Sequence, residues 1–195
     1  MAEPTFSLCV YCGSRAGDSP SFEAAATAVG TWIGQHGGQL VYGGGRNGLM
    51  GTVAQATLAA GGRVVGVIPR ALVEKEWAHT ECTELHIVET MHERKQMMAE
   101  RADAFIALPG GIGTFEEFFE VWTWRQLGYH NKPIGLLNLE AYYDPLLTFL
   151  HSVVAHDFMG SWQMDLIQSH ADAFTLLPNL VQAAGLPIKF QSESI

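Results

Sequence analysis

Positive charge is scarce in this chain of 195 residues, which has 11 lysine and arginine residues against 20 aspartate and glutamate residues. The formal net charge is therefore −9. This balance argues against general nucleic-acid binding, which requires a basic surface. A small anionic ligand requires only a local positive site, so the placement of the few basic residues becomes informative.

Long apolar runs, a basic N-terminal segment and a cysteine framework are missing as well. No apolar run reaches the ~20 residues that a membrane-spanning helix needs. The first residues, MAEPTFSLCVYCGS, lack the basic segment of a secretory signal. Three cysteines, an odd number, do not form a disulfide framework. We therefore expect a reduced, cytoplasmic protein that has no membrane partner.

Motifs for metal binding and thiol redox chemistry are also lacking. The eight histidines show neither H-x-x-x-H nor H-E-x-x-H spacing, so we expect no metal site. Cys9 and Cys12 form C-x-x-C. Redox pairs of this spacing open a helix, whereas Cys9 falls inside an apolar, strand-like segment. This position favours a buried core residue over a redox centre.

Apolar, β-branched segments alternate with segments of helical pattern along the chain. We expect strands at residues 5–11, 39–44, 63–69, 85–89, 104–108 and 133–138, and a short one near 165–169. We expect helices at residues 20–36, 48–61, 90–101, 114–128 and 144–157, and a last helix that is broken near Pro178. This order predicts a single domain, residues 1–195, of the α/β class: a Rossmann-like, doubly wound parallel sheet in three α/β/α layers.

Glycine-rich turns follow three of the expected strands, with the sequences CGSR (12–15), GGGRNG (43–48) and PGGIGT (109–114). In a parallel sheet the three turns lie at one edge, where ligands of such folds bind. Glycine lets backbone N–H groups approach a phosphate, and the following helix contributes its positive end. Together the turns indicate a ligand of nucleotide size.

Residues 43–48 also match G-x-G-x-x-G, the dinucleotide-binding pattern. That pattern requires an acidic residue roughly 20 positions later to hold the ribose. The corresponding region reads VIPR (67–70), which does not support an NAD site. Arg70 keeps a NADP-binding oxidoreductase open as an alternative, although no strong hydride-transfer site is evident.

Five of the 11 basic residues fall near the same edge of the expected sheet. Arg15, Arg46 and Arg70 follow strand ends, and Arg94 and Lys95 lie early in the helix that follows the fourth strand. For Arg46 and Arg70, the ordinary polarity of short loops is an equally good interpretation. For Arg94 we favour a functional role.

Acidic residues directly after a phosphate-binding turn need an explanation. The spacing of Thr114 and Glu117 predicts a capping box, and Thr90 and Glu93 repeat the pattern. The functional alternative is that a carboxylate faces the phosphate-lined cleft. There it can stabilise the oxocarbenium-like state through which an N-glycosidic bond breaks. An arginine in the same cleft can hydrogen-bond the leaving base or neutralise the phosphate.

The motif PGGIGTFEE, with MHERKQMM upstream, resembles the Lonely Guy family of cytokinin-activating phosphoribohydrolases, long misannotated as lysine decarboxylases. The resemblance extends through YCGSRAGDSP, VYGGGRNGLMG, VVGVIP, TWRQLGYHNKPIGLLN and YYDPLL. It implies hydrolysis of N6-substituted adenosine 5′-monophosphates to the free base and ribose 5-phosphate. No PLP or other cofactor and no metal is implied.

The resemblance also implies which residues act. Arg94 and Glu117 would be the catalytic pair. Substrate binding would involve Ser14, Gly44, Gly45, Arg94, Lys95, Gly110, Gly111, Gly113, Thr114 and Glu116. Arg15 stands where many relatives have a second serine, which leaves its role open. The resemblance further implies a homodimer, and the helix at 114–128 is apolar nearly all round, as a helix that meets a second chain would be.

Two other functions remain to be weighed. A nucleotide-binding or carrier protein without turnover would keep the glycine turns but would have no use for Arg94 and Glu117 together. A PLP-dependent decarboxylase needs a buried Schiff-base lysine. The four lysines, at positions 75, 95, 132 and 189, do not lie in such a setting.

Overall fold

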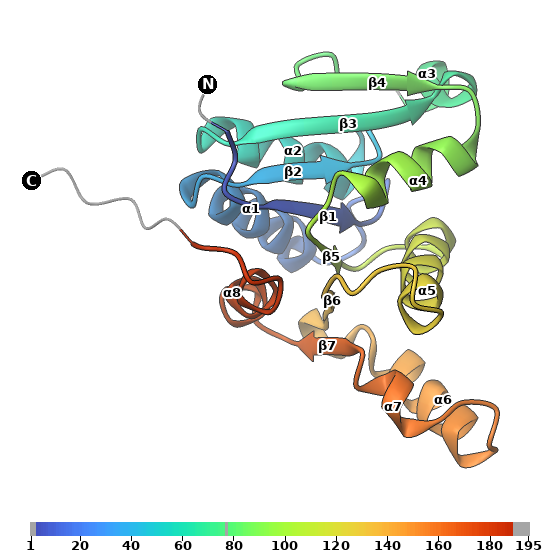
Figure 1. The fold of residues 1–195 in the computed structure, drawn as a ribbon. Helices are drawn as coiled ribbons and strands as arrows, with labels where there is room; N and C mark the ends of the chain where they lie inside the picture. The colour runs from blue at the N-terminus through green and yellow to red at the C-terminus, as the bar shows by residue number, and fades with distance from the viewer. Residues whose placement is uncertain (1–2, 77, 189–195) are drawn as a thin grey trace, which may run out of the picture.

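The computed structural model describes residues 3–76 and 78–188. Seven parallel strands form one sheet in the order β4-β3-β2-β1-β5-β6-β7 (Figure 1). The strands are β1 (Ser7–Tyr11), β2 (Gln39–Tyr42), β3 (Arg63–Pro69), β4 (Glu84–Val88), β5 (Ala104–Ala107), β6 (Ile134–Leu137) and β7 (Ile167–His170). The predicted Rossmann-like α/β class is confirmed, including the short seventh strand.

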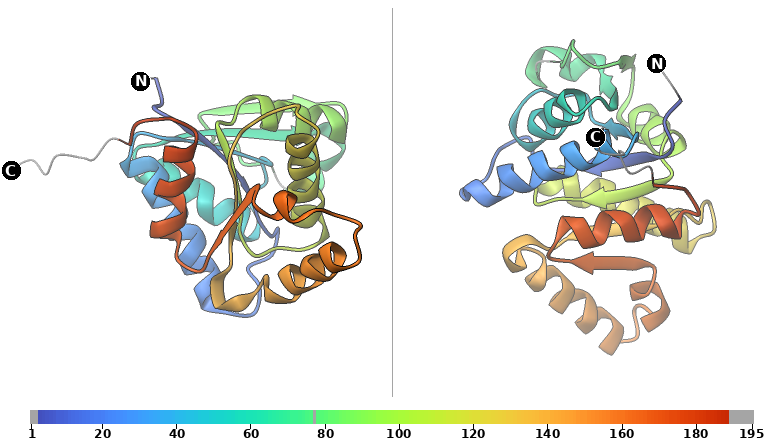
Figure 2. Two further views of the ribbon diagram at one scale, coloured as in Figure 1. Left: turned by 60° about the horizontal axis from the view of Figure 1, so that its bottom comes forward. Right: turned by 90° about the vertical axis from the view of Figure 1, so that its left-hand side faces the viewer.

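Helices cover both faces of the sheet, as Figure 2 shows. The helices are α1 (Pro20–Gln35), α2 (Gly48–Ala59), α3 (Arg70–Glu76), α4 (Met91–Glu100), α5 (Ile112–Gln126), α6 (Asp144–Ala155), α7 (Ser161–Met164) and α8 (Ala173–Ala183), with a 3₁₀ turn at Leu139–Ala141. Among the helices in the described part of the chain, none has the length and hydropathy needed to cross a membrane.

Two hydrophobic cores lie on the two sides of the sheet. In β1, Leu8 and Val10 belong to the core under α1, α2 and α8, whereas Cys9 and Tyr11 belong to the core under α4, α5 and α6. This alternation follows from the period of two in a strand. Because Cys9 and Cys12 belong to different cores, they face opposite sides of the sheet. Both are buried free thiols, which confirms the core interpretation of C-x-x-C.

The prediction that the last helix breaks near Pro178 is wrong. Helix α8 runs without interruption from Ala173 to Ala183, with Pro178 inside it. Buried Leu176, Leu177, Leu180 and Val181 lie on both sides of the proline and hold the helix against the sheet. Their burial offsets the single hydrogen bond that the proline cannot make. Helices α3 and α7 are short additions that the sequence pattern did not reveal.

The strand order reverses direction between β1 and β5. The chain moves outward from β1 to β4, then returns to β5 beside β1 and continues to β7 on the other side. In open α/β sheets, ligands bind at this reversal, beyond the carboxyl ends of the strands. The turns after β1 and β5 are therefore the first place to look for a site.

Candidate functional site

The turns after β1 and β5 meet at the reversal point. The N–H of Gly13 donates to the carbonyl oxygen of Pro109 at 3.1 Å, which joins the two turns directly. Gly110 lies against the side chain of Thr114, since a Cβ on this glycine would stand 2.1 Å from the Thr114 Oγ1. The expected convergence of these two glycine turns is confirmed.

Helix α5 begins earlier than the sequence pattern predicts. Extended Gly111 is its N-cap, Ile112 is its first residue, and no side chain caps it. Thr114 is the third helical residue and is only 3% exposed. The predicted capping box between Thr114 and Glu117 is therefore wrong. The two glutamates lie one turn deeper in the helix, so complementing its dipole does not explain them.

Helix α4 begins with the other predicted capping box, which is confirmed. The Thr90 hydroxyl accepts from the Glu93 N–H at 3.1 Å, and the Glu93 carboxylate accepts from the Thr90 N–H at 3.3 Å. The box fixes the first turn of α4. Arg94 is the next residue, so its position follows from the cap.

Arg94 is buried, with 6% of its surface exposed. Its Nε donates to the Val67 carbonyl at 3.1 Å, and its Nη2 donates to the Gly43 carbonyl at 3.0 Å. Met91 contributes a sulfur contact at 3.8 Å to Nη1. A guanidinium held by two backbone carbonyls has one fixed plane. Arg94 is therefore a preorganised positive charge at the carboxyl ends of β2 and β3.

A cavity of about 220 Å³ brings the predicted catalytic pair together. Arg94 lines it from α4, and Glu117 lines it from α5. The other lining residues come from the two glycine turns, α2 and the starts of α4 and α5: Cys12, Gly13, Ser14, Met50, Met91, Gly111, Ile112, Gly113, Thr114 and Glu116. Seven of the predicted site residues thus line one small cavity: Ser14, Arg94, Gly111, Gly113, Thr114, Glu116 and Glu117.

Gly111 and Gly113 stand out among the glycines of this cavity. A Cβ on either residue would meet no protein atom within 4 Å. The packing of the protein therefore does not require glycine at these two positions. Both glycines line the cavity at the start of α5, and the first N–H groups of a helix have no partners within it. This arrangement favours an anion such as a phosphate.

A second cavity of about 570 Å³ adjoins the first. Gly13, Ser14, Gly111 and Ile112 line both cavities, and Ile112 is 86% exposed between them. The remaining walls of this second cavity are mostly apolar and include Phe22, Leu49, Pro109 and Tyr142. It is also lined by Gly110, Arg15 and Asp18. A groove of this combined size can hold a nucleotide. Arg15, whose role the sequence left open, faces this groove.

The second glycine turn packs closely against neighbouring parts of the protein. A Cβ on Gly43 would stand 1.9 Å from the Arg94 Nη2, so this glycine makes room for the arginine. Gly44 has a positive φ of 76° and packs against β3, and Gly45 forms a bridge with Ala78. The predicted ligand residues Gly44 and Gly45 do not line either cavity.

Lys95 lies beside the cavity but does not line it. Its ammonium group donates to Glu116 and, at 2.9 Å, to Glu120. Burial alone would lower the pKa of Lys95, but these hydrogen bonds raise it above its ordinary value. Lys95 therefore stays charged and holds Glu116 in place.

Of the other basic residues, Arg70 pairs with Glu89 at 3.1 Å on the surface.

Glu117 also acts on buried groups of β1 and on Cys12, the residue that follows this strand. Burial raises the pKa of the Cys12 thiol, and the nearby Glu117 carboxylate raises it further. The same two causes, burial first, raise the pKa values of Cys9 and Tyr11. These groups therefore remain neutral. Within the described residues, no three His, Cys, Asp or Glu side chains form a group that could hold a metal ion.

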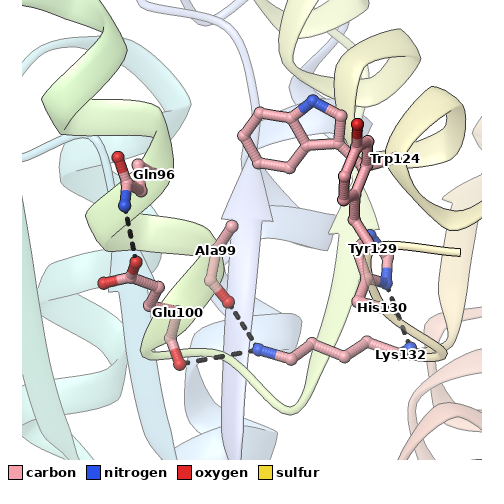
Figure 3. A pocket seen from close by; sticks show the side chains of 7 residues that line it. All are labelled: Gln96, Ala99, Glu100, Trp124, Tyr129, His130 and Lys132. Atoms are coloured by element: carbon pink, nitrogen blue, oxygen red, sulfur yellow. Dashed lines mark hydrogen bonds between the residues drawn. The ribbon is translucent and has the colours of Figure 1, made fainter. Parts of the chain in front are cut away.

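A third cavity of about 570 Å³ lies between α4 and the end of α5 (Figure 3). Lys132 spans it and donates to the Ala99 carbonyl at 2.6 Å, and burial lowers the pKa of this lysine. His130 accepts from the Lys132 N–H at 3.1 Å. No predicted site residue lines this cavity. The sequence did not reveal it, since no motif marks it.

The sequence patterns did not identify two aromatic residues of the second cavity, Phe22 and Tyr142. Their rings meet edge to face at 5.9 Å. Tyr142 belongs to the YYDPLL segment and follows the carboxyl end of β6, the strand next to β5. Its place after a strand end was the available signal.

Comparisons with known proteins identify relatives of this chain. A family model described as possible lysine decarboxylase matches residues 50–180. A cytokinin riboside 5′-monophosphate phosphoribohydrolase of Rhodococcoides fascians is 51% identical over 161 residues, which are 82% of this chain and 81% of that protein. One from Arabidopsis thaliana is 46% identical over 173 residues, which are 89% of this chain and 81% of that protein.

Solved structures support the same fold. A molybdenum cofactor carrier protein from Chlamydomonas reinhardtii superimposes with a TM-score of 0.69 at 20% identity, covering 94% of this chain and 99% of that one. A molybdenum cofactor binding protein from Rippkaea orientalis gives a TM-score of 0.68 at 19% identity, covering 94% and 98%. At such low identity the likeness concerns the fold alone.

Proposed function

The chain belongs to the Lonely Guy family of cytokinin riboside 5′-monophosphate phosphoribohydrolases. From this premise we propose that it hydrolyses the N-glycosidic bond of adenosine 5′-monophosphates that carry an N6 substituent. The products are the free base and ribose 5-phosphate. We include AMP itself among the substrates. The observation that carries the proposal is the meeting of Arg94 and Glu117 in one cavity beside the open amino end of α5.

The phosphate is bound first in this scheme. Gly111 and Gly113 leave open space over the start of α5, and Thr114 and Ser14 line the same cavity. The N–H groups and the positive end of the helix attract a phosphate group. A 220 Å³ cavity suits ribose 5-phosphate, so the base extends into the adjoining, more apolar cavity.

Glu117 stabilises the reacting sugar. As the bond to the base breaks, positive charge develops on the ribose, and a carboxylate in a partly buried site lowers the energy of that state. Water then supplies the hydroxyl group at C1′, and the base leaves with a proton. A guanidinium is a poor proton donor, so Arg94 acts by charge and hydrogen bonding rather than as the acid.

Purified protein incubated with AMP or isopentenyladenosine monophosphate, with no cofactor added, tests this function by chromatography. We expect the free base and ribose 5-phosphate in equal amounts. The ratio of the two rates reports on the base pocket. Intact nucleotide in both samples, together with stoichiometric binding, would instead identify a nucleotide carrier.

We also propose that the protein is a homodimer. Exposed apolar side chains lie on α4, at the start of α5 and just after it: Met91, Ile112, Leu127 and Tyr129. Part of the apolar surface of α5 is covered within the chain, since the Trp122 indole donates to the Gln163 carbonyl at 3.0 Å. Light scattering at micromolar concentration tests the proposal, and a monomeric mass would contradict it. The free cysteines support our further proposal of a cytoplasmic location.

A further inference from the structure

Hydrogen bonds fix three consecutive carbonyl groups of the turn after β5. The Leu108 carbonyl accepts from the Tyr143 hydroxyl at 2.7 Å. The Pro109 carbonyl accepts from the Gly13 N–H at 3.1 Å. The Gly110 carbonyl accepts from the Tyr142 hydroxyl at 2.5 Å. The orientation of every peptide plane from 108 to 111 is therefore determined by a partner outside the turn.

The last of these bonds orients the N–H of Gly111. The described residues contain no cis peptide bonds, so the N–H of Gly111 points away from the Gly110 carbonyl and from Tyr142. Gly111 is the N-cap of α5 and lines the 220 Å³ cavity that also contains Arg94 and Glu117. The Tyr142 hydroxyl thus holds one of the N–H groups at the anion-binding end of this helix in a single direction.

Burial does not explain this bond. Tyr143 is 1% exposed, and its buried hydroxyl needs a partner in any case. Tyr142 is 37% exposed, so water could satisfy its hydroxyl equally well. The bond from Tyr142 to Gly110 is therefore a feature that the fold alone does not require.

The backbone immediately before Tyr142 is strained. Glu140 and Ala141, the two residues before it, have left-handed φ values of 52° and 60°. Such conformations persist where surrounding contacts impose them, and they gather at functional sites. Here the Asn138 side chain accepts from the Tyr143 N–H at 2.7 Å and donates to Asp144 at 2.7 Å. The segment after β6 is thus fixed on both sides of the tyrosine pair.

We propose that Tyr142 is a positioning residue for the phosphate of the nucleotide, acting through the Gly110 carbonyl and the Gly111 N–H. The inference rests on the proposed function in one respect, namely that the bound anion is the 5′-phosphate of the substrate. The inference is narrower than the proposed function, because it concerns the binding of a phosphate monoester and not the breaking of the glycosidic bond.

The test is Tyr142→Phe, which removes only the hydroxyl group. Ribose 5-phosphate, the probe, is titrated by calorimetry into the wild-type protein and the variant. We expect its Kd to rise by about 5- to 10-fold, the effect of weakening one hydrogen bond from the Gly111 N–H to the phosphate. The KM for AMP should rise by a similar factor while kcat changes by less than about 3-fold. The melting temperature should stay within about 1 °C, since Tyr142 is not part of the core.

Two controls separate the phosphate effect from a general one. Tyr129→Phe removes the hydroxyl of an exposed residue that lines the third cavity and neither of the other two, and it should leave the Kd unchanged. Adenosine, which lacks the phosphate, should bind Tyr142→Phe as it binds the wild-type protein. An equal loss of affinity for adenosine would mean that Tyr142 is merely a wall of the base cavity, and the inference would fail.

The remaining outcomes are also decisive. Unchanged binding of ribose 5-phosphate by folded Tyr142→Phe would overturn the inference. So would a wild-type protein that does not bind ribose 5-phosphate, because the turn would then not be an anion site. If the wild-type protein binds ribose 5-phosphate but releases no base from AMP, the proposed hydrolysis fails. The ratio of the Kd values of ribose 5-phosphate for Tyr142→Phe and the wild-type protein still decides the role of Tyr142.

Discussion

Arg94 on α4 donates to the carbonyl oxygen of Gly43 at 3.0 Å, and the absence of a side chain on Gly43 is what lets it do so. The glycine belongs to a motif that resembles a ligand-binding loop. In this structure its backbone instead orients a charged side chain of the protein. Through Arg94, the relationship connects the carboxyl end of β2 to the 220 Å³ cavity that Arg94 lines.

Gly43→Ala should therefore impair activity more than stability. The new Cβ would stand 1.9 Å from the Arg94 Nη2, and the guanidinium must move. We expect kcat/KM for AMP to fall by about 100-fold, because the proposed role of Arg94 depends on its position. Thermal unfolding and steady-state kinetics measure the two effects. Activity within a few-fold of wild type would show that the orientation of Arg94 is not critical.

Glu117→Gln tests the role of the carboxylate in catalysis. Glutamine keeps the size of Glu117 and one of its hydrogen-bond-accepting oxygens, so the fold should survive the substitution. Loss of the negative charge beside the developing cation should lower kcat by at least about 100-fold. Glu120→Gln is the matched control, because Glu120 lies one turn later, pairs with Lys95 and does not line the cavity. Similar activities for the two variants would contradict the assignment.

Gly111→Ala tests the anion site by steric obstruction. Its φ of −99° suits alanine, and the new Cβ would meet no protein atom within 4 Å. The melting temperature should therefore stay near the wild-type value. The Cβ would occupy the open space over the start of α5, so the KM for AMP should rise by about 10-fold or more. Unchanged KM would place the phosphate elsewhere.

Much of the site follows from the sequence because its residues lie at strand ends of one parallel sheet. The alternation of strands and helices placed the glycine turns at one edge, and the Thr90–Glu93 box fixed the position of Arg94. The resemblance paired Arg94 with Glu117, and the structure brings the two into one cavity. These features depend on local pattern and on topology.

The features that the sequence did not reveal depend on contacts between distant segments. Extended Gly111 allows α5 to begin at Ile112, two residues before the expected start at Thr114. Tyr142 reaches the Gly110 carbonyl from a segment 32 residues away. Helix α8 continues through Pro178 because the sheet beneath it holds the flanking leucines. Periodicity and motif spacing do not contain such information.

Stability should fall as the pH drops below neutrality, and His130 should be one cause. Its Nε2 donates to the Val121 carbonyl at 2.9 Å and its Nδ1 accepts from the Lys132 N–H at 3.1 Å, so the ring is held neutral. Burial lowers the pKa of His130 below its ordinary value of 6.5, and burial likewise lowers that of His79. Below pH 6.5 the unfolded chain binds protons that the folded protein resists, which favours unfolding.

The stability due to neutral His130 is therefore complete above pH 6.5 and is lost as the pH falls through the lowered pKa of the folded state. In His130→Gln, the amide can donate to Val121 and accept from Lys132 without titrating. Urea unfolding at pH 7.5 and pH 5.5 should show a smaller loss of stability for this variant than for the wild-type protein. His151→Gln, at an exposed position of α6, is the matched control for a histidine-to-glutamine change. An equal loss in wild type and His130→Gln would assign the acid sensitivity to other groups, His79 first among them.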